Sequence, residues 1–363
     1  MDVTTVRVYD AAQGTMLLRL PASSWSWTEE LNSAGRLQVT VKGSREAARL
    51  ELRRYLVPWR VNVAVVRGQD VLFAGALKHF NFDMATGVLK LDCGGGWSWF
   101  EKRLVLNHDL AAAWRDGEVR LDEHSPAAGW LLSLSGSLAS IARDLVEEAL
   151  KWGYLPFDLP AKEPGFNVRN YDGFDFATVS DRLKDLTGVI NAPEIRFTPY
   201  LTGEGFLRFR MEAARELVDR VHEWDTRRPD SHVIVSSIDT DGDAISNQVY
   251  ASGGKKDDLV LVARAMRSTE GWYPLLQSAL SEHSSVSELD TLLGHCREAI
   301  VRGGAGQDSI AVKVSTDRRV RAGDWANLHV NDWFFGETVL PLKIVSVAGD
   351  EGEWLTCEAR VRG

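Results

Sequence analysis

The fold is decided by residues 25–41, which read Trp25-Ser-Trp-Thr-Glu-Glu-Leu-Asn-Ser-Ala-Gly-Arg-Leu-Gln-Val-Thr-Val41. The segment Asn32-Ser-Ala-Gly35 has the composition of a tight turn, and its glycine can take a positive φ. After the turn, Leu37, Val39 and Val41 alternate with polar residues, so one face is apolar and the other faces solvent. The stretch therefore predicts an antiparallel hairpin with one buried face.

The composition predicts a soluble protein of more than one domain. A chain of 363 residues is too long for one ordinary core. Its contents of 44% hydrophobic and 26% charged residues are ordinary for globular proteins. No apolar run approaches the ~18 residues that span a bilayer. The start of the chain has neither the basic nor the apolar region of a signal peptide, so we expect no membrane insertion.

Cysteine usage indicates no disulfide framework. Cys93, Cys296 and Cys357 are odd in number and widely separated. This spacing fits neither paired disulfides nor a CxxC metal motif. We expect three small buried side chains in a protein made in a reducing cytosol.

The net charge of −9, from 42 basic and 51 acidic residues, argues against a free-standing nucleic-acid binder. A mildly acidic soluble protein is the ordinary interpretation. The charge also suits a surface past which nucleic acid slides, because like charges repel phosphate.

Residues 1–100 have an almost purely β pattern. Strands beginning at Val61, Val71 and Val88 are joined by short glycine-containing turns and predict a meander. Gly75, inside the middle strand, predicts a bulge or a sharp bend. A short helix is expected within residues 44–56.

The middle of the chain predicts an α+β unit. Apolar residues recur at helical spacing from Leu138 to Leu150, and Gly153 ends this helix. A second, shorter helix begins with Asp175 as N-cap and stops at Gly188. A hairpin is expected over residues 195–211.

The last third returns to β structure with a helical interruption. Residues 233–253 predict a hairpin around Asp239-Thr-Asp-Gly-Asp243, followed by a strand at 259–265. A helix is expected over 287–300, with Ser287 and Asp290 as a capping box. Four more strands are predicted at 310–314, 325–330, 339–347 and 354–361.

No motif in the sequence predicts catalysis, a metal site or a cofactor. The acidic run at 239–243 lacks the glycine and glutamate positions of an EF-hand, and strands rather than helices are expected on both sides. We interpret it as a solvated hairpin tip. There is no HExxH, GxSxG, Walker or GxGxxG motif in a suitable context.

Tryptophan is used heavily, with 13 Trp against 7 Tyr. Trp25 and Trp27, like Trp97 and Trp99, are two residues apart, which on a strand places both members of a pair on one face. Two interpretations stay open: packing in a β core, which we favour, or an exposed platform for sugar stacking or partner contact.

Several segments together resemble the tail hub family of long-tailed bacteriophages, also called baseplate hub or minor tail proteins. The hairpin of residues 25–41 is similar to the family's early hairpin. Ser246-Asn-Gln-Val-Tyr-Ala-Ser-Gly253 and Val320-Arg-Ala-Gly-Asp-Trp-Ala-Asn-Leu-His-Val330 resemble two later strands. The sequence departs from the pattern at Ala251, where valine is common, and by lacking a proline before Gly323.

The resemblance implies an α+β, mostly β chain with two β-barrel-like domains, at 1–104 and 232–363. An α+β domain at 105–231 would lie between them, and the second barrel would carry a helical insertion at about 266–305. The implied function is that of a structural virion component without enzymatic activity. It would be a baseplate hub whose homotrimeric ring connects the hexameric distal tail to fibres or spike and lines the DNA ejection channel.

The resemblance also implies partners and a location. The partners would be further copies of the chain, the distal tail protein ring, tail fibre or spike proteins, the tape measure protein, and DNA in transit. The location would be the virion tail tip, after assembly in the host cytoplasm. A channel lining should then be acidic or neutral, because each retained phosphate contact would slow ejection.

Two other function classes remain as alternatives. One is a cell-wall or polysaccharide-acting enzyme that uses acidic residues. The other is a carbohydrate-binding β module at the tail tip that uses the paired tryptophans.

Overall fold

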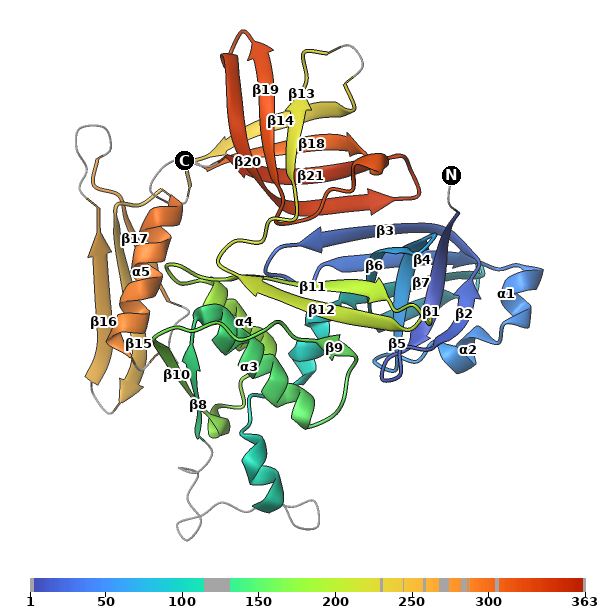
Figure 1. Ribbon diagram of the computed structural model, residues 1–363, viewed down its shortest axis with the longest axis horizontal. Coiled ribbons are helices and arrows are strands. Elements are labelled where there is room, and N and C mark those ends of the chain that lie inside the picture. The colour runs from blue at the N-terminus through green and yellow to red at the C-terminus, as the bar shows by residue number, and fades with distance from the viewer. Residues whose placement is uncertain are drawn as a thin grey trace.

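The computed structural model describes residues 3–113, 131–228, 231–243, 245–256, 259–267, 274–281, 286, 288–303 and 307–361. The described chain is mostly β with a few helices, which confirms the predicted α+β, mostly β class. Figure 1 shows the N-terminal strands in blue on the right and the C-terminal strands in red at the top. The central α+β part is green, and a small orange unit lies at the left edge.

The N-terminal strands are antiparallel to one another, and two short helices, α1 (Arg45–Arg49) and α2 (Leu52–Tyr55), accompany them. The predicted hairpin is confirmed, and both Asn32 and Gly35 have φ of 60°. Leu37, Val39 and Val41 are buried while their neighbours face outward. The strands are β1 (Thr4–Asp10), β2 (Met16–Leu20), β3 (Ala22–Glu30), β4 (Arg36–Lys42), β5 (Val61–Arg67), β6 (Asp70–Asp83) and β7 (Val88–Gly95).

Gly75 marks a close approach of two backbones within the β6–β7 pair. A Cβ at this position would lie 1.8 Å from the carbonyl oxygen of Gly94, so no larger residue fits without a shift. The register irregularity comes slightly later, between Leu77 and His79. The first part of β6 pairs with β5, and the remainder pairs with β7 alone.

The C-terminal strands form a second β unit, which is hydrogen-bonded directly to the N-terminal β unit. They are β14 (Val233–Asp241), β18 (Gln307–Ser315), β19 (Trp325–Asp332), β20 (Gly336–Asp350) and β21 (Trp354–Val361), with β13 (Val221–Asp225) parallel to β19. The end of β20 pairs antiparallel with β3, from Ser346 opposite Glu30 to Asp350 opposite Ser26.

The hydrogen bonds of the described strands therefore build one sheet of 13 strands and close neither unit into a barrel. Its main path runs β14-β18-β21-β20-β3-β4-β7-β6-β5-β1-β2. The two units form one sheet because β20 is long: its 15 residues pair in turn with β19, β21 and β3. One hydrophobic core, with Leu37 from the first unit and Val312 and Ile344 from the second, lies under this sheet.

The central α+β part packs against the first unit around a second core. The predicted helix is confirmed as α3 (Leu138–Lys151). In α4 (Val179–Thr187) the predicted N-cap, Asp175, is wrong, because the Thr178 hydroxyl accepts from the N–H of Asp181 and Phe176 has a left-handed φ of 49°. The other elements are η1 (Gly96–Lys102), η2 (His108–Ala113), β8 (Leu131–Gly136), β9 (Phe157–Asp158), β10 (Asn167–Asp172), η4 (Gly173–Asp175), β11 (Glu194–Leu201) and β12 (Leu207–Ala214).

The unit inserted between β14 and β18 is a small sheet covered by one helix. It contains β15 (Gln248–Lys256), β16 (Leu259–Met266), β17 (Gln277–Leu280) and α5 (Leu289–Gly303). The predicted hairpin over 233–253 is wrong, because β14 pairs with β18 whereas β15 pairs with β16 and β17. The predicted capping residue Ser287 lies outside the described residues.

A buried carboxylate holds β13 beside β19. Asp324 is fully buried and accepts from the backbone N–H groups of Arg220 and Arg321, both at 3.1 Å. Oδ1 accepts from Arg220, and Oδ2, which accepts from Arg321, also lies 2.9 Å from Nε2 of His222. Burial alone would raise the pKa of Asp324, but the hydrogen bonds from His222 and the backbone outweigh it and hold the pKa below its usual value. The motif Gly323-Asp324 is therefore structural.

We predict that Asp324→Asn lowers the free energy of unfolding near neutral pH by about 2 kcal/mol, because hydrogen bonds to a charged acceptor are lost. A lowered carboxyl pKa stabilises the fold above the usual titration range, and this contribution disappears as the pH falls through the lowered pKa. The loss of unfolding free energy caused by Asp324→Asn should therefore be smaller at acidic pH than at neutral pH. Urea unfolding at neutral and acidic pH measures it, with exposed Asp241→Asn as control. A loss of the same size at every pH would contradict the prediction.

Candidate functional site

The solvent-facing side of the joined sheet carries rows of polar residues. The first row crosses β6, β7, β4, β3 and β20, and its paired residues are His79, Asp92, Gln38, Ser26 and Asp350. The alternate residues of these strands point into the core under the sheet. The row thus belongs to one continuous polar face that spans both terminal β units.

A second row extends this face to the edge of the sheet. It crosses six strands, from β4 to β14, through Arg36, Thr28, Ala348, Thr356, Lys313 and Ile234. The two rows together carry two acidic and two basic side chains among small or uncharged ones. One opposite pair is in contact, since Nε of Arg36 lies 2.8 Å from Asp92. The charges along these rows cancel.

The polar face is hollowed over the N-terminal strands. A cavity of about 520 Å³ lies there, lined by Ser24, Gln38, Asn81, Lys90 and Glu351 among others. Amides, hydroxyls and the Arg36–Asp92 ion pair make up half of its lining, and Trp25, Val39 and Leu91 add apolar side chains. Water can solvate this surface, and its balanced charges give a strongly charged ligand no site to bind.

The strands that carry the polar face have two free edges within the described chain, apart from those of β2 and β13 elsewhere in the sheet. β14 pairs with β18 on one side only. The part of β6 from His79 to Asp83 pairs with β7 only, because β5 ends its pairing at Ala76. The eight strands that carry the polar face therefore present unpaired backbone groups at both ends, which favours pairing with another chain.

A buried ion cluster lies where the two terminal units meet. Arg196 on β11 is only 3% exposed. Its Nε donates to Glu212 at 3.0 Å, its Nη2 to Asp219 at 2.8 Å, and its Nη1 to the carbonyl oxygen of Ala322 at 2.7 Å. One guanidinium thus connects β11, β12, the segment before β13 and the turn before β19.

Glu29 of β3 completes this cluster. Its carboxylate accepts from the N–H of Ala322 at 3.3 Å. Burial raises the pKa of Glu29, although Arg196 and Arg321 nearby oppose the shift. The cluster therefore ties β3 to the turn before β19 at Glu29, a residue that also pairs with Val347 of β20.

The four tryptophans singled out from the sequence pack inside the protein. Trp27, Trp97 and Trp99 are buried, and Trp25 is partly buried against the core under the sheet. Trp25 and Trp27 share the core face of β3, whereas Trp97 and Trp99 lie in η1 rather than on a strand.

The indole nitrogens of these residues differ in their partners. Nε1 of Trp97 donates to Ser180 at 2.9 Å, and Nε1 of Trp99 donates to Asn62 at 3.2 Å. Those of Trp25 and Trp27 are buried without a partner in the described part of the protein. Trp27, Trp97 and Trp99 are too buried for a sugar to stack on them, whereas the partly buried Trp25 lines the cavity of about 520 Å³.

Among the described residues, the most exposed aromatic cluster was not predicted from the sequence. It is the tip of the β19–β20 hairpin, where Trp333 is 94% and Phe334 71% exposed. Their rings are 5.7 Å apart, and Phe335 packs partly against the core. The Asp332 carboxylate fixes the turn by accepting from the N–H groups of Phe334 and Phe335. The sequence could have indicated this exposed tip, because three consecutive aromatic residues lie between two predicted strands.

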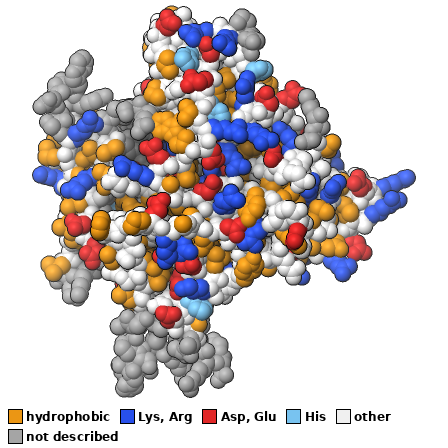
Figure 2. All heavy atoms as spheres, viewed as in Figure 1, with side chains coloured by type: hydrophobic (Ala, Val, Ile, Leu, Met, Phe, Trp, Pro, Cys, Tyr) orange, Lys and Arg blue, Asp and Glu red, His pale blue; other side chains and the backbone are white. Residues whose placement is uncertain are grey.

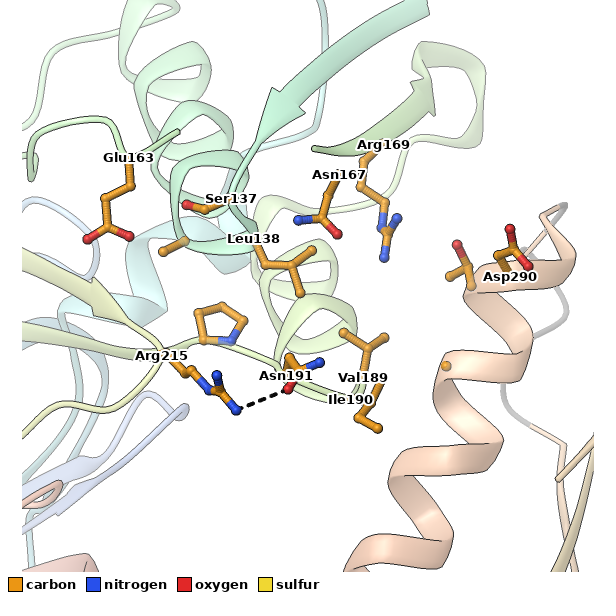
Figure 3. Close-up of a pocket in the computed structure, with 14 residues that line it drawn as sticks. Ser137, Leu138, Glu163, Asn167, Arg169, Val189, Ile190, Asn191, Arg215 and Asp290 are labelled. Carbon is orange, nitrogen blue, oxygen red and sulfur yellow. Dashed lines mark hydrogen bonds between the residues drawn. The ribbon is translucent and has the colours of Figure 1, made fainter. Parts of the chain in front are cut away.

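A cleft of about 470 Å³ separates the central α+β part from the inserted unit. Figure 3 shows Arg169 and Asp290 on opposite sides of it, and Arg215 hydrogen-bonded to Asn191 at 3.3 Å. Nδ1 of His295 on α5 lies 3.0 Å from the carbonyl oxygen of Gly188, at the end of α4. The cleft is a gap between packed units with mixed charges.

The described residues contain no group of three or more His, Cys, Asp or Glu side chains placed to hold a metal. Asp239, Asp241 and Asp243 are exposed, and the first two lie within β14 rather than at a hairpin tip. The three cysteines are buried and unpaired. Across the same residues, no helix has the length and apolarity to cross a membrane.

We predict that Arg196→Met lowers the free energy of unfolding by about 3 kcal/mol, because it removes three hydrogen bonds of a buried guanidinium and leaves the partly buried Glu212 without its counter-charge. The matched change Arg36→Met removes an exposed ion pair and should cost less than about 1 kcal/mol. Denaturant unfolding of both variants measures the difference. Equal losses would show that the cluster does not hold the units together.

No family model matches this sequence, and no curated protein matches it. Solved structures do resemble it. A tail protein from Neisseria meningitidis aligns with 99% of this chain and 96% of its own at 12% identity and a TM-score of 0.54. A 43 kDa tail protein of a Shewanella oneidensis prophage aligns with 99% and 98% at 13% identity and a TM-score of 0.52.

A prophage tail protein from Listeria monocytogenes aligns with 98% of this chain and 94% of its own, at 10% identity and a TM-score of 0.51. All three similarities run over nearly the whole length of both chains. They confirm, at the level of the fold, the resemblance predicted from the sequence: this chain has the fold of phage tail proteins.

Proposed function

We propose that this protein is a structural component of a phage tail, the hub at the tail tip, and that it assembles into a homotrimeric ring. The observation that carries the proposal is the uninterrupted sheet through β3 and β20, with free edges at β14 and at the end of β6. Free edges are satisfied when copies pair head to tail around a closed ring. The ring would be built by residues 1–104 and 232–363.

The two terminal β units explain why a trimer suits this position. Three copies with two β units each would place six units around the axis. That number matches the hexameric distal tail protein ring above it. In such a ring each unit would be a barrel-like domain, with the α+β part at 105–231 and the inserted unit outside.

The polar face is suited to line a channel for DNA. Its small polar side chains and cancelling charges give phosphate few places to bind, and each avoided contact lowers salt-sensitive retention. The buried positions of Trp27, Trp97 and Trp99 lend no support to a carbohydrate-binding module. No described constellation of side chains supports an enzymatic role, so we assign none.

The partners would be the distal tail protein, tail fibre or spike proteins and the tape measure protein. The protein would be assembled in the host cytoplasm and reside at the virion tail tip. The aromatic tip at Trp333 and Phe334 projects from the β19–β20 hairpin and has the composition of a protein contact.

We predict a three-fold ring for the assembled protein, seen by electron microscopy of tail tips or of the concentrated protein. Ile234→Lys adds a charge to the free edge of β14 and should weaken the ring without unfolding the chain. Val168→Lys on β10 is the control, since both side chains are about half exposed. A ring of two-, four- or five-fold symmetry would refute the proposal.

We predict that joint replacement of Trp333 and Phe334 by Ser changes stability by no more than about 0.5 kcal/mol, because both side chains are exposed. Tails assembled with this variant should lose fibre or spike protein. Joint replacement of Phe166 and Val168, exposed just before and within β10, is the matched control. Protein analysis of purified tails measures the loss. Unchanged tail composition would remove the assigned role of the tip.

A further inference from the structure

A second cleft, of about 820 Å³, lies between the C-terminal strands and the N-terminal and central parts. Apolar side chains line part of it, among them Leu72, Pro199, Leu201 and Leu355. It lies beside the buried Arg196 cluster, so its walls are held by hydrogen bonds between β11 and β12 and between Glu29 of β3 and the N–H of Ala322. It is a formed groove with both apolar and charged walls.

Five arginines from separate segments converge on this cleft, and Figure 2 shows Lys and Arg side chains gathered where the C-terminal strands meet the rest of the molecule. Four of the five make no salt bridge with described residues. Arg67 donates to Thr4 at 3.3 Å, Arg321 to Thr198 at 3.4 Å, and Arg210 stacks on Tyr200. The exposed Arg220 completes the four, and Arg319 is the fifth.

Three of the six carboxylates that line this cleft pair with an arginine. Glu212 and Asp219 accept from Arg196, and Asp70 pairs with Arg319 at 2.9 Å. Asp350 accepts from the N–H of Gly352 at 2.7 Å. Four arginines without a salt bridge to described residues thus share the cleft with three carboxylates that have none either, Glu29, Asp317 and Asp350. Burial raises the pKa of Glu29, which reduces its negative charge.

We propose that this cleft binds an extended acidic segment of a partner protein. Guanidinium groups pair with carboxylates in a planar, bidentate geometry, and four of them are available here. Side chains alternate along an extended peptide, so acidic residues can face the arginines while apolar residues cover Leu72 and Leu201. The apolar walls favour a segment that alternates acidic and apolar side chains over a nucleic acid, whose charged backbone has no apolar side chains to cover them. The inference does not depend on the proposed ring.

The test uses fluorescence anisotropy with the full chain and a labelled peptide of alternating Glu and Leu. The same peptide with Lys in place of Glu and a labelled single-stranded DNA serve as comparison probes. We expect the Glu–Leu peptide to bind, to bind more weakly as salt is raised, and to bind more tightly than either comparison probe.

Joint replacement of Arg210 and Arg220 by Glu should weaken peptide binding by roughly tenfold or more, since paired charges at an interface are removed and reversed. The exposed Arg45 and Arg49 on α1, replaced by Glu, give a control with the same change in net charge. Thermal unfolding establishes that each variant is folded. If the Glu variant does not fold, Arg210→Gln with Arg220→Gln replaces it. Absence of peptide binding, an equal loss in the control, or tighter binding of DNA would overturn the proposal.

Discussion

The antiparallel pairing of β20 with β3 is the contact on which the rest of the structure depends. It unites strands from opposite ends of the chain and lets them share one core. The pairing requires a glycine, because a Cβ at Gly349 would lie 2.8 Å from the indole of Trp27. Such a long-range contact forms only after a large loop is closed, so we expect it late in folding. The polar face, the cleft and the ion cluster all take their geometry from it.

The Arg196 cluster shows how the two units acquire a defined orientation. A buried ion pair is a weak source of net stability, because desolvation offsets its attraction. Its value here is directional: Arg196 makes three hydrogen bonds to three different segments. An apolar contact at the same place would let these segments slide past one another. The three N–H donors of Arg196 are satisfied in only one arrangement of β11, β12 and the Ala322 turn.

Local patterns predicted the elements of this protein well and their partners poorly. The turn at Asn32 and Gly35 and the periodicity of α3 depend on neighbouring residues, so the sequence contains them. Alternation along β14 reveals a buried face but not the strand beside it, which is why β18 replaced the expected partner. The polar rows exist only once the register is known. The tryptophan pairs were visible, but the exposure of Trp333 depends on how far its hairpin projects.

The length of β20 also has a mechanical consequence. Interstrand hydrogen bonds lie across the strand direction, so a pull along β20 loads all its bonds to β3 at once. A pull across the strands would break them one at a time. The two terminal parts should therefore resist sliding far better than peeling. The molecule should therefore be stiff when it is loaded along β20 and weaker when it is loaded at right angles to this strand.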